Sequence, residues 1–73
     1  METQTVEVFK TNVKQKRQAK RLLNILSQQF PLCRINFDLE DCDKILRVEG
    51  NNIRHEKITA LVTGHGYRCD ILE

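Results

Sequence analysis

The chain has 73 residues, 40% of them apolar, and its formal net charge of +2 is too small to indicate nucleic-acid binding by itself. A chain this short supports one thin hydrophobic core, so we expect residues 1–73 to form a single domain. No segment approaches the roughly 20 apolar residues that cross a bilayer, which argues against a membrane protein.

Local patterns predict one strand and one helix in the first half of the chain. Residues 5–9 alternate with the period of a half-buried strand, and we expect the two valines to face the core. Apolar residues then recur at helical spacing between residues 19 and 30. We expect Asn12 to cap this helix at its N-terminus and Pro31 to end it.

The second half predicts a hairpin, a second helix and a last strand. Residues 35–40 and 45–48 alternate, and the Asp-Cys-Asp run at 41–43 is typical of a turn between paired strands. Residues 58–65 carry an apolar helical stripe, and glycines mark its end. Residues 67–71 alternate again in a short final strand.

The element order β-α-β-β-α-β predicts an α+β fold, a ferredoxin-like two-layer sandwich. Its four-stranded antiparallel sheet is expected to carry two helices on one face. Right-handed crossovers would then place three connections at one end of the sheet. That end gathers residues 10–16, 38–43 and 65–67, and we expect any site to lie there.

Charge is distributed unevenly along the chain. Six cations and no acid lie between residues 10 and 21, and four acids lie within residues 38–43. Such runs are usually solvated surface, and here the acidic hairpin would offset cations placed at a helix N-terminus. The alternative is a docking surface for an acidic protein partner or a small anion. The candidate binding residues are Lys10, Lys14, Lys16, Arg17, Asp41 and Asp43.

Two motifs resemble the heavy-metal-associated (HMA) domain family of copper chaperones and metal-pump N-terminal domains. The run N-F-D-L-E at residues 36–40 is similar to the family's alternating strand that ends in D-L-E. The family also has a helix of pattern I-x-x-x-I/V-x-x-x-G-Y. That pattern is matched by Ile58, Val62, Gly66 and Tyr67. The resemblance covers residues 6–72 and implies the same βαββαβ fold.

The resemblance also implies a metal motif, M-x-C-x-x-C, in the first strand-to-helix loop, which this chain lacks. Two thiolates at i and i+3 would converge there on a soft ion such as Cu(I). Residues 11–17 read T-N-V-K-Q-K-R and hold no cysteine, methionine or histidine. We therefore expect a divergent member of the family with no metal or other cofactor at this loop.

The remaining cysteines leave one alternative metal site open. Cys42 in the hairpin turn and His65 near the last turn could hold zinc or copper, with Asp41 or Asp43 nearby. Two ligands make a weak site, and His65 also falls on an apolar stripe where packing explains it. Cys69 is expected to be a small core residue. Three widely spaced cysteines favour reduced thiols over a disulfide framework.

Neither catalysis nor RNA binding is expected. The only serine is Ser27 on a helix, no catalytic motif occurs, and an open sheet cannot exclude water from a reaction. RNA-recognition domains stack bases on aromatic residues of the open sheet face, where we expect one aromatic residue and four acids. The expected open face comprises Glu7, Phe9, Asn36, Asp38, Ile45, Arg47, Glu49, Arg68 and Asp70.

The sequence thus predicts a non-enzymatic binding or interaction module of HMA-like fold without a CxxC metal site. The alternative is a divergent copper or zinc protein that uses Cys42 and His65. The polar first residues are followed by no apolar signal core, so we expect a cytoplasmic protein.

Overall fold

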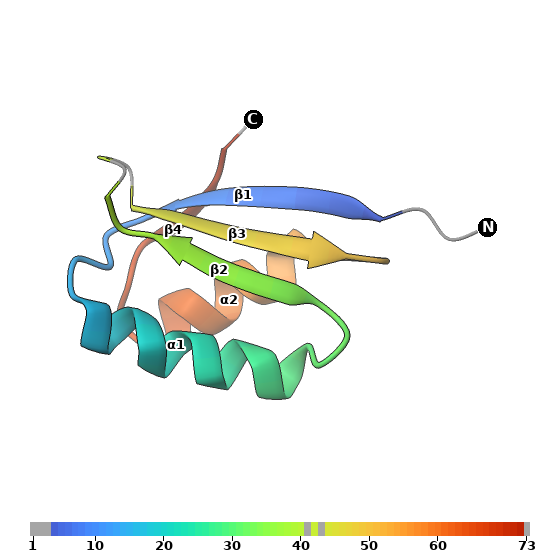
Figure 1. Cartoon of the computed structure of the whole chain (residues 1–73), viewed down its shortest axis with the longest axis horizontal. Coiled ribbons are helices and arrows are strands. Elements are labelled where there is room, and N and C mark those ends of the chain that lie inside the picture. Colours follow the sequence, from blue (N-terminus) through green and yellow to red (C-terminus); the bar gives the residue numbers. More distant parts are fainter. Residues whose placement is uncertain (1–3, 41, 43, 73) are drawn as a thin grey trace.

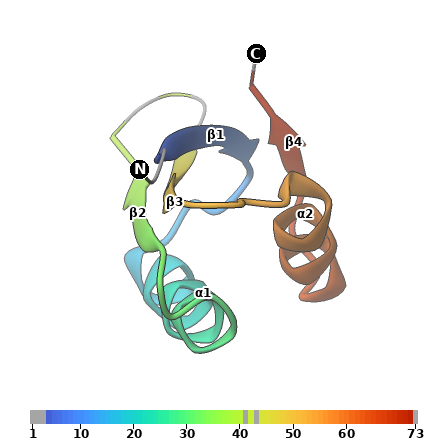
Figure 2. The ribbon, with the colours of Figure 1, turned by 90° about the vertical axis from the view of Figure 1, so that its right-hand side faces the viewer.

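The structure is a computed structural model, and it describes residues 4–40, 42 and 44–72. The strands form one antiparallel sheet in the order β2-β3-β1-β4, and both helices lie against one face of it (Figures 1 and 2). The predicted α+β, ferredoxin-like sandwich is therefore confirmed. The elements are β1 (Thr5–Thr11), α1 (Lys16–Gln29), β2 (Arg34–Asp38), β3 (Ile45–Gly50), α2 (His55–Gly64) and β4 (Cys69–Ile71).

The helix α1 follows from an apolar stripe and from local polar contacts at its start. Leu22 and Leu26 are buried on the stripe. The N-cap is Gln15, whose backbone N–H donates to Oε1 of Gln18 at 3.4 Å. The prediction that Asn12 caps α1 was wrong, because its side chain is used instead in a contact with the other end of the chain, described below.

The core lies between the sheet and the two helices, and the two central strands and both helices contribute fully buried side chains. Apolar residues of β1 and β3 meet the stripes of α1 and α2, and one loop residue between β1 and α1 fills the end of the core. The largest fully buried side chains are Phe9, Val13, Leu22, Leu26, Leu46, Val48, Ile58 and Val62.

The buried face of β1 is the opposite of the predicted one. Phe9 is 0% exposed, whereas Val6 is 50% exposed. The register with β3 explains this, because Phe9 pairs with the buried Leu46 and Val8 pairs with the exposed Arg47. Both faces of β1 carry apolar residues, so alternation alone left its orientation undetermined. The partner strand decided it, since a shift of one residue moves every side chain to the other face.

The open sheet face carries balanced charge, and none of its described residues is aromatic. Of the residues predicted to lie on the open face, those on β2 and β3 and Asp70 do lie there. Glu7 and Phe9 instead point to the helix side, and Arg68 precedes β4. Three cations and three acids therefore share this face. From the strand register it comprises Val6, Val8, Lys10, Arg34, Asn36, Asp38, Ile45, Arg47, Glu49, Asp70 and Leu72.

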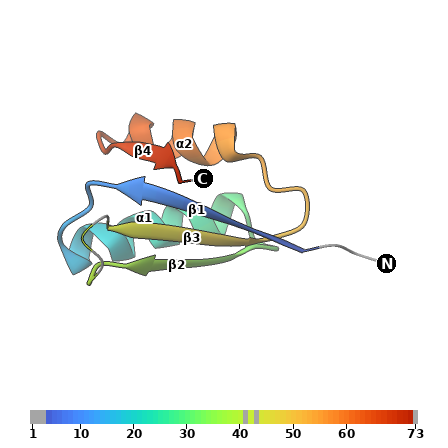
Figure 3. The ribbon, with the colours of Figure 1, turned by 90° about the horizontal axis from the view of Figure 1, so that it is seen from above.

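Three connections meet at one end of the sheet, as the crossover rule predicted. Figure 3 shows the β1–α1 loop, the β2–β3 hairpin and the α2–β4 turn together at that end. We call it the loop end. The α1–β2 and β3–α2 connections lie at the opposite end (Figure 3).

The reversed orientation of β1 predicts a strong asymmetry between two substitutions. Phe9→Ala should destabilise the fold by about 3–5 kcal/mol, because it leaves a cavity in the core. Val6→Ala, at a half-exposed position, should cost less than about 1 kcal/mol. Urea denaturation followed by circular dichroism measures both. If Phe9→Ala does not fold, Phe9→Leu replaces it. Phe9→Leu should still be less stable than Val6→Ala. Equal losses would show that the face assignment is wrong.

Candidate functional site

The loop end is held together by a buried hydroxyl group at the end of β1. Thr11 is buried, and its Oγ1 donates to the backbone carbonyl of Lys44 at 2.6 Å. The same oxygen accepts the backbone N–H of Val13 at 3.3 Å. One side chain therefore makes a hydrogen bond within the first loop and another that connects this loop to the start of β3. A buried hydroxyl with donor and acceptor both used is a stabilising arrangement.

A second bond ties the first loop to the last connection. Oδ1 of Asn12 accepts the backbone N–H of Arg68 at 2.8 Å, across 56 positions of sequence. The hairpin is also held from its own side, because Nζ of Lys44 donates to the carbonyl of Leu39 at 2.9 Å. The three connections are thus joined by specific hydrogen bonds between described residues.

Four cations of α1 lie on the exposed side of its first two turns, next to the exposed Lys14 of the loop. Lys16 and Lys20 are four positions apart, as are Arg17 and Arg21, so each pair is adjacent on the helix surface. No acid occupies the first turn. We call this group the basic surface; it comprises Lys14, Lys16, Arg17, Lys20 and Arg21.

The basic surface carries unfavourable electrostatic energy. Among the described residues, none of its five side chains forms an ion pair. Cations at a helix N-terminus cost a few tenths to about 1 kcal/mol each, and like charges at i and i+4 cost about 0.2–0.5 kcal/mol per pair. A solvated helix selected for stability alone would place acids in these positions. The stability of the helix therefore does not explain why cations occupy these positions.

The structure separates Lys10 from the other predicted cations. Lys10 lies on the open sheet face, where it pairs in register with Asp70 of β4 and Ile45 of β3. It lines a small hollow of about 190 Å³ together with Asn12 and Arg68. The α1 cations lie on the helix layer on the other side of the sheet. The prediction grouped Lys10 with the α1 cations because they are close in the sequence, but they lie on opposite sides of the sheet.

Described acidic residues approach one side of the basic surface without forming an ion pair with it. Lys16 lines a groove of about 320 Å³ that Asp38 and Glu40 also line. Asp38 is engaged locally, because its Oδ1 accepts the backbone N–H of Glu40 at 3.2 Å. The expected partners Asp41 and Asp43 lie outside the described residues. Asp38 and Glu40 therefore lie at the Lys16 side of the surface.

Cys42 and His65 of the alternative metal site are both exposed at the loop end, on different connections. Cys42 is in the hairpin that joins β2 to β3, whereas His65 leads into β4 at the opposite edge of the sheet. A zinc ion needs both donor atoms within roughly 2.3 Å of it. In the part of the chain that the structure describes, no three residues of metal-ligating type gather into a group that could hold an ion.

The three thiols lie in different environments. Cys42 is exposed, Cys33 is half-buried and Cys69 is buried in the core, as predicted for Cys69. Burial raises the pKa of the Cys69 thiol from 9.0 to about 11, and the charge of Asp70 adds to the shift while a bond with Thr59 opposes it. The neutral form is the one that fits this core position.

Comparison with known proteins adds no support to the resemblance to HMA domains, which rests on the sequence motifs alone. No protein-family model matches this chain, and no curated protein or solved structure matches it either. Within the described residues, no helix combines the length and apolar character needed to cross a bilayer.

Sequence reasoning found part of this site. Lys20 and Arg21 belong to the charge run seen in the sequence, and their i+4 spacing from Lys16 and Arg17 was the available signal for one surface. The roles of Thr11 and Asn12 had no sequence signal, because their partners lie 33 and 56 positions away.

The bond network of Thr11 predicts a measurable loss of stability in Thr11→Val. This change keeps the shape of the side chain but leaves the Lys44 carbonyl and the Val13 N–H without their partner, which should cost about 1–3 kcal/mol. The control is Thr63→Val, because the Thr63 hydroxyl is exposed and bonds only within its own helix. Urea unfolding compares the two variants. A Thr11→Val variant as stable as the control would show that the hydroxyl does not hold the loop end.

The thiol environments predict an order of reactivity with iodoacetamide at pH 8. Cys42 should be alkylated fastest, Cys33 more slowly and Cys69 last, because burial and a raised pKa both suppress its thiolate. The raised pKa also gives a pH dependence. The stabilisation from neutral Cys69 is fully present below pH 9 and is lost as the pH rises through about 11. Mass spectrometry reads the order, and early modification of Cys69 in folded protein would contradict it.

Proposed function

We propose that this chain is a non-enzymatic interaction module of HMA-like fold that binds an acidic segment of a protein partner through the basic surface. The observation that carries the proposal is the run of exposed cations on α1, which holds no acid and forms no ion pair with the described residues. The arrangement lowers the stability of the helix, and an acidic partner would remove that cost. Charge complementarity of this kind accelerates association and selects partners.

A hollow beside the basic surface favours a protein over a small anion. Between α1 and the end of α2, Arg21, Ile25 and Tyr67 line a hollow of about 360 Å³, and the exposed His65 lines it as well. Protein interfaces rely on aromatic and arginine side chains around pockets that receive an apolar group of the partner. A small anion would use the cations alone and would leave this hollow unoccupied. The combination fits a segment with acidic residues and one apolar side chain.

The decisive variant is Lys16→Glu with Arg17→Glu. It should abolish binding, yet it should stabilise the domain by about 1–2 kcal/mol, because it places acids at the helix N-terminus and creates Glu–Lys and Glu–Arg pairs at i and i+4. The melting temperature should rise by roughly 5–15 °C, so unfolding cannot explain a loss of binding. The control is Arg47→Glu with Lys57→Glu, which makes the same change of charge on the open sheet face and on α2.

The three proteins are immobilised and used to capture partners from a cell extract at low salt. The expected partners have acidic segments, bind the wild type and the control, and are absent from the Lys16→Glu/Arg17→Glu sample. They should elute as the salt concentration rises, since the contact is electrostatic. Partners retained by that variant would overturn the proposal. So would saturable binding of inorganic phosphate to the basic surface, measured by NMR, without capture of an acidic protein.

A further inference from the structure

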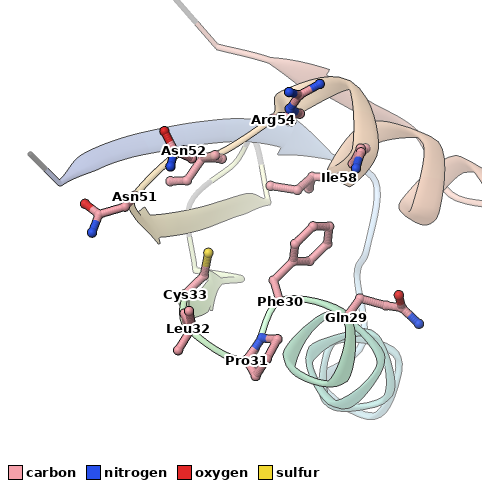
Figure 4. Close-up of a pocket in the computed structure, with 11 residues that line it drawn as sticks. Gln29, Phe30, Pro31, Leu32, Cys33, Asn51, Asn52, Arg54 and Ile58 are labelled. Carbon is pink, nitrogen blue, oxygen red and sulfur yellow. The ribbon is translucent and has the colours of Figure 1, made fainter. Parts of the chain in front are cut away.

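A second concave surface lies at the end of the molecule opposite the loop end. It is a groove of about 360 Å³ between the C-terminal end of α1 and the N-terminal end of α2 (Figure 4). Its volume falls in the range of small-molecule sites. Neither the basic surface nor the predicted metal residues contribute to it.

The centre of the groove is apolar and is supported by the core. Phe30 and Ile58 point toward each other across it (Figure 4), and Phe30 packs against the core cluster. The half-buried Ile53 lines it as well. Cys33 is held close to Gly50, where an added Cβ would lie 2.8 Å from its Sγ. The wall at Cys33 is therefore fixed by close packing with β3.

The rim adds an exposed apolar residue that the fold does not require. Leu32 lines the groove and is 95% exposed, the largest exposed fraction among the large apolar residues of the described chain. An apolar side chain left in water contributes nothing to the stability of the domain. At the edge of an apolar groove it can cover a bound apolar group.

The charged residues that line the groove are all cations. Arg54 and Lys57, at the start of α2, are exposed and form no ion pair with any described residue. The nearby Glu56 does not line the groove and is 2.9 Å from Nε2 of His55. The groove therefore combines an apolar centre with two cations on one side and no described acid.

We propose that this groove binds a small carboxylate with an apolar tail. The tail lies along Phe30 and Ile53 beneath Leu32, and the carboxylate is placed at Arg54 and Lys57. Arginine and lysine both pair with carboxylates, and apolar pockets with a few polar groups orient such ligands. The site is separate from the basic surface, so it stands or falls independently of the proposed interaction with an acidic protein.

The test is an NMR titration of the ¹⁵N-labelled protein with octanoate. Saturable shifts are expected in residues 30–33 and 51–58. Hexanoate should bind more weakly by about fourfold for each methylene removed, and acetate should not bind measurably. Octanol, which has the tail without the charge, should bind at least fivefold more weakly than octanoate.

Two matched pairs of variants separate the tail from the charge. Arg54→Gln with Lys57→Gln should weaken octanoate at least fivefold and leave octanol unchanged, whereas Lys20→Gln with Arg21→Gln should change neither. Leu32→Asn should weaken both probes about two- to fivefold without altering stability, because the side chain is exposed. Its control is Leu72→Asn, which replaces an exposed leucine elsewhere.

Three results would overturn the proposal. The first is octanol binding as tightly as octanoate, which would remove the role of the cations. The second is a set of octanoate shifts centred on the basic surface. The third is a set of shifts in residues 30–33 that depends on protein concentration without added octanoate, which would show that a second copy of the chain occupies the groove.

Discussion

The pairing of β1 with β3 is the constraint on which the rest of the structure depends. It places Phe9 beside Leu46 on the helix side of the sheet, and with them it determines which face both helices cover. The same pairing carries Thr11 to the start of β3, where its hydroxyl reaches the Lys44 carbonyl. The position of the first loop, and therefore of the start of α1, follows from the register of these two central strands.

The basic surface and the groove depart from the most stable arrangement of the domain in different ways. The basic surface places like charges in adjacent turns of α1 and at the positive end of its dipole, against local electrostatics. The groove leaves a leucine in water beside an apolar centre. Sites where a chain departs from its most stable choice are where function is expected, because the departure is retained despite its energetic cost. The domain is small, so it can carry few such departures.

The metal-binding cysteine pair of HMA domains, which this chain resembles, would lie at the place in the fold where this chain has the basic surface. At the start of α1 a pair of thiolates would be stabilised by the helix dipole and would attract a soft cation. This chain has Gln15 and Gln18 at an i and i+3 spacing there, and the backbone of one bonds to the side chain of the other. Cations surround them. The electrostatics of this helix start therefore suit an anionic partner better than a metal ion.

The sequence by itself determined the order and type of the elements, the antiparallel four-stranded sheet and the end at which the connections meet. These follow from periodicity and from the handedness of crossovers, which act over a few residues or through general rules of chain geometry. Only the tertiary structure decided the buried face of β1, the role of Asn12 and the separation of Lys10 from the α1 cations. Each of those depends on a partner strand or turn more than 30 positions away in the chain, such as Leu46, Arg68 or Ile45. The physical reason is that register and long-range hydrogen bonds choose between local arrangements that periodicity alone leaves equivalent.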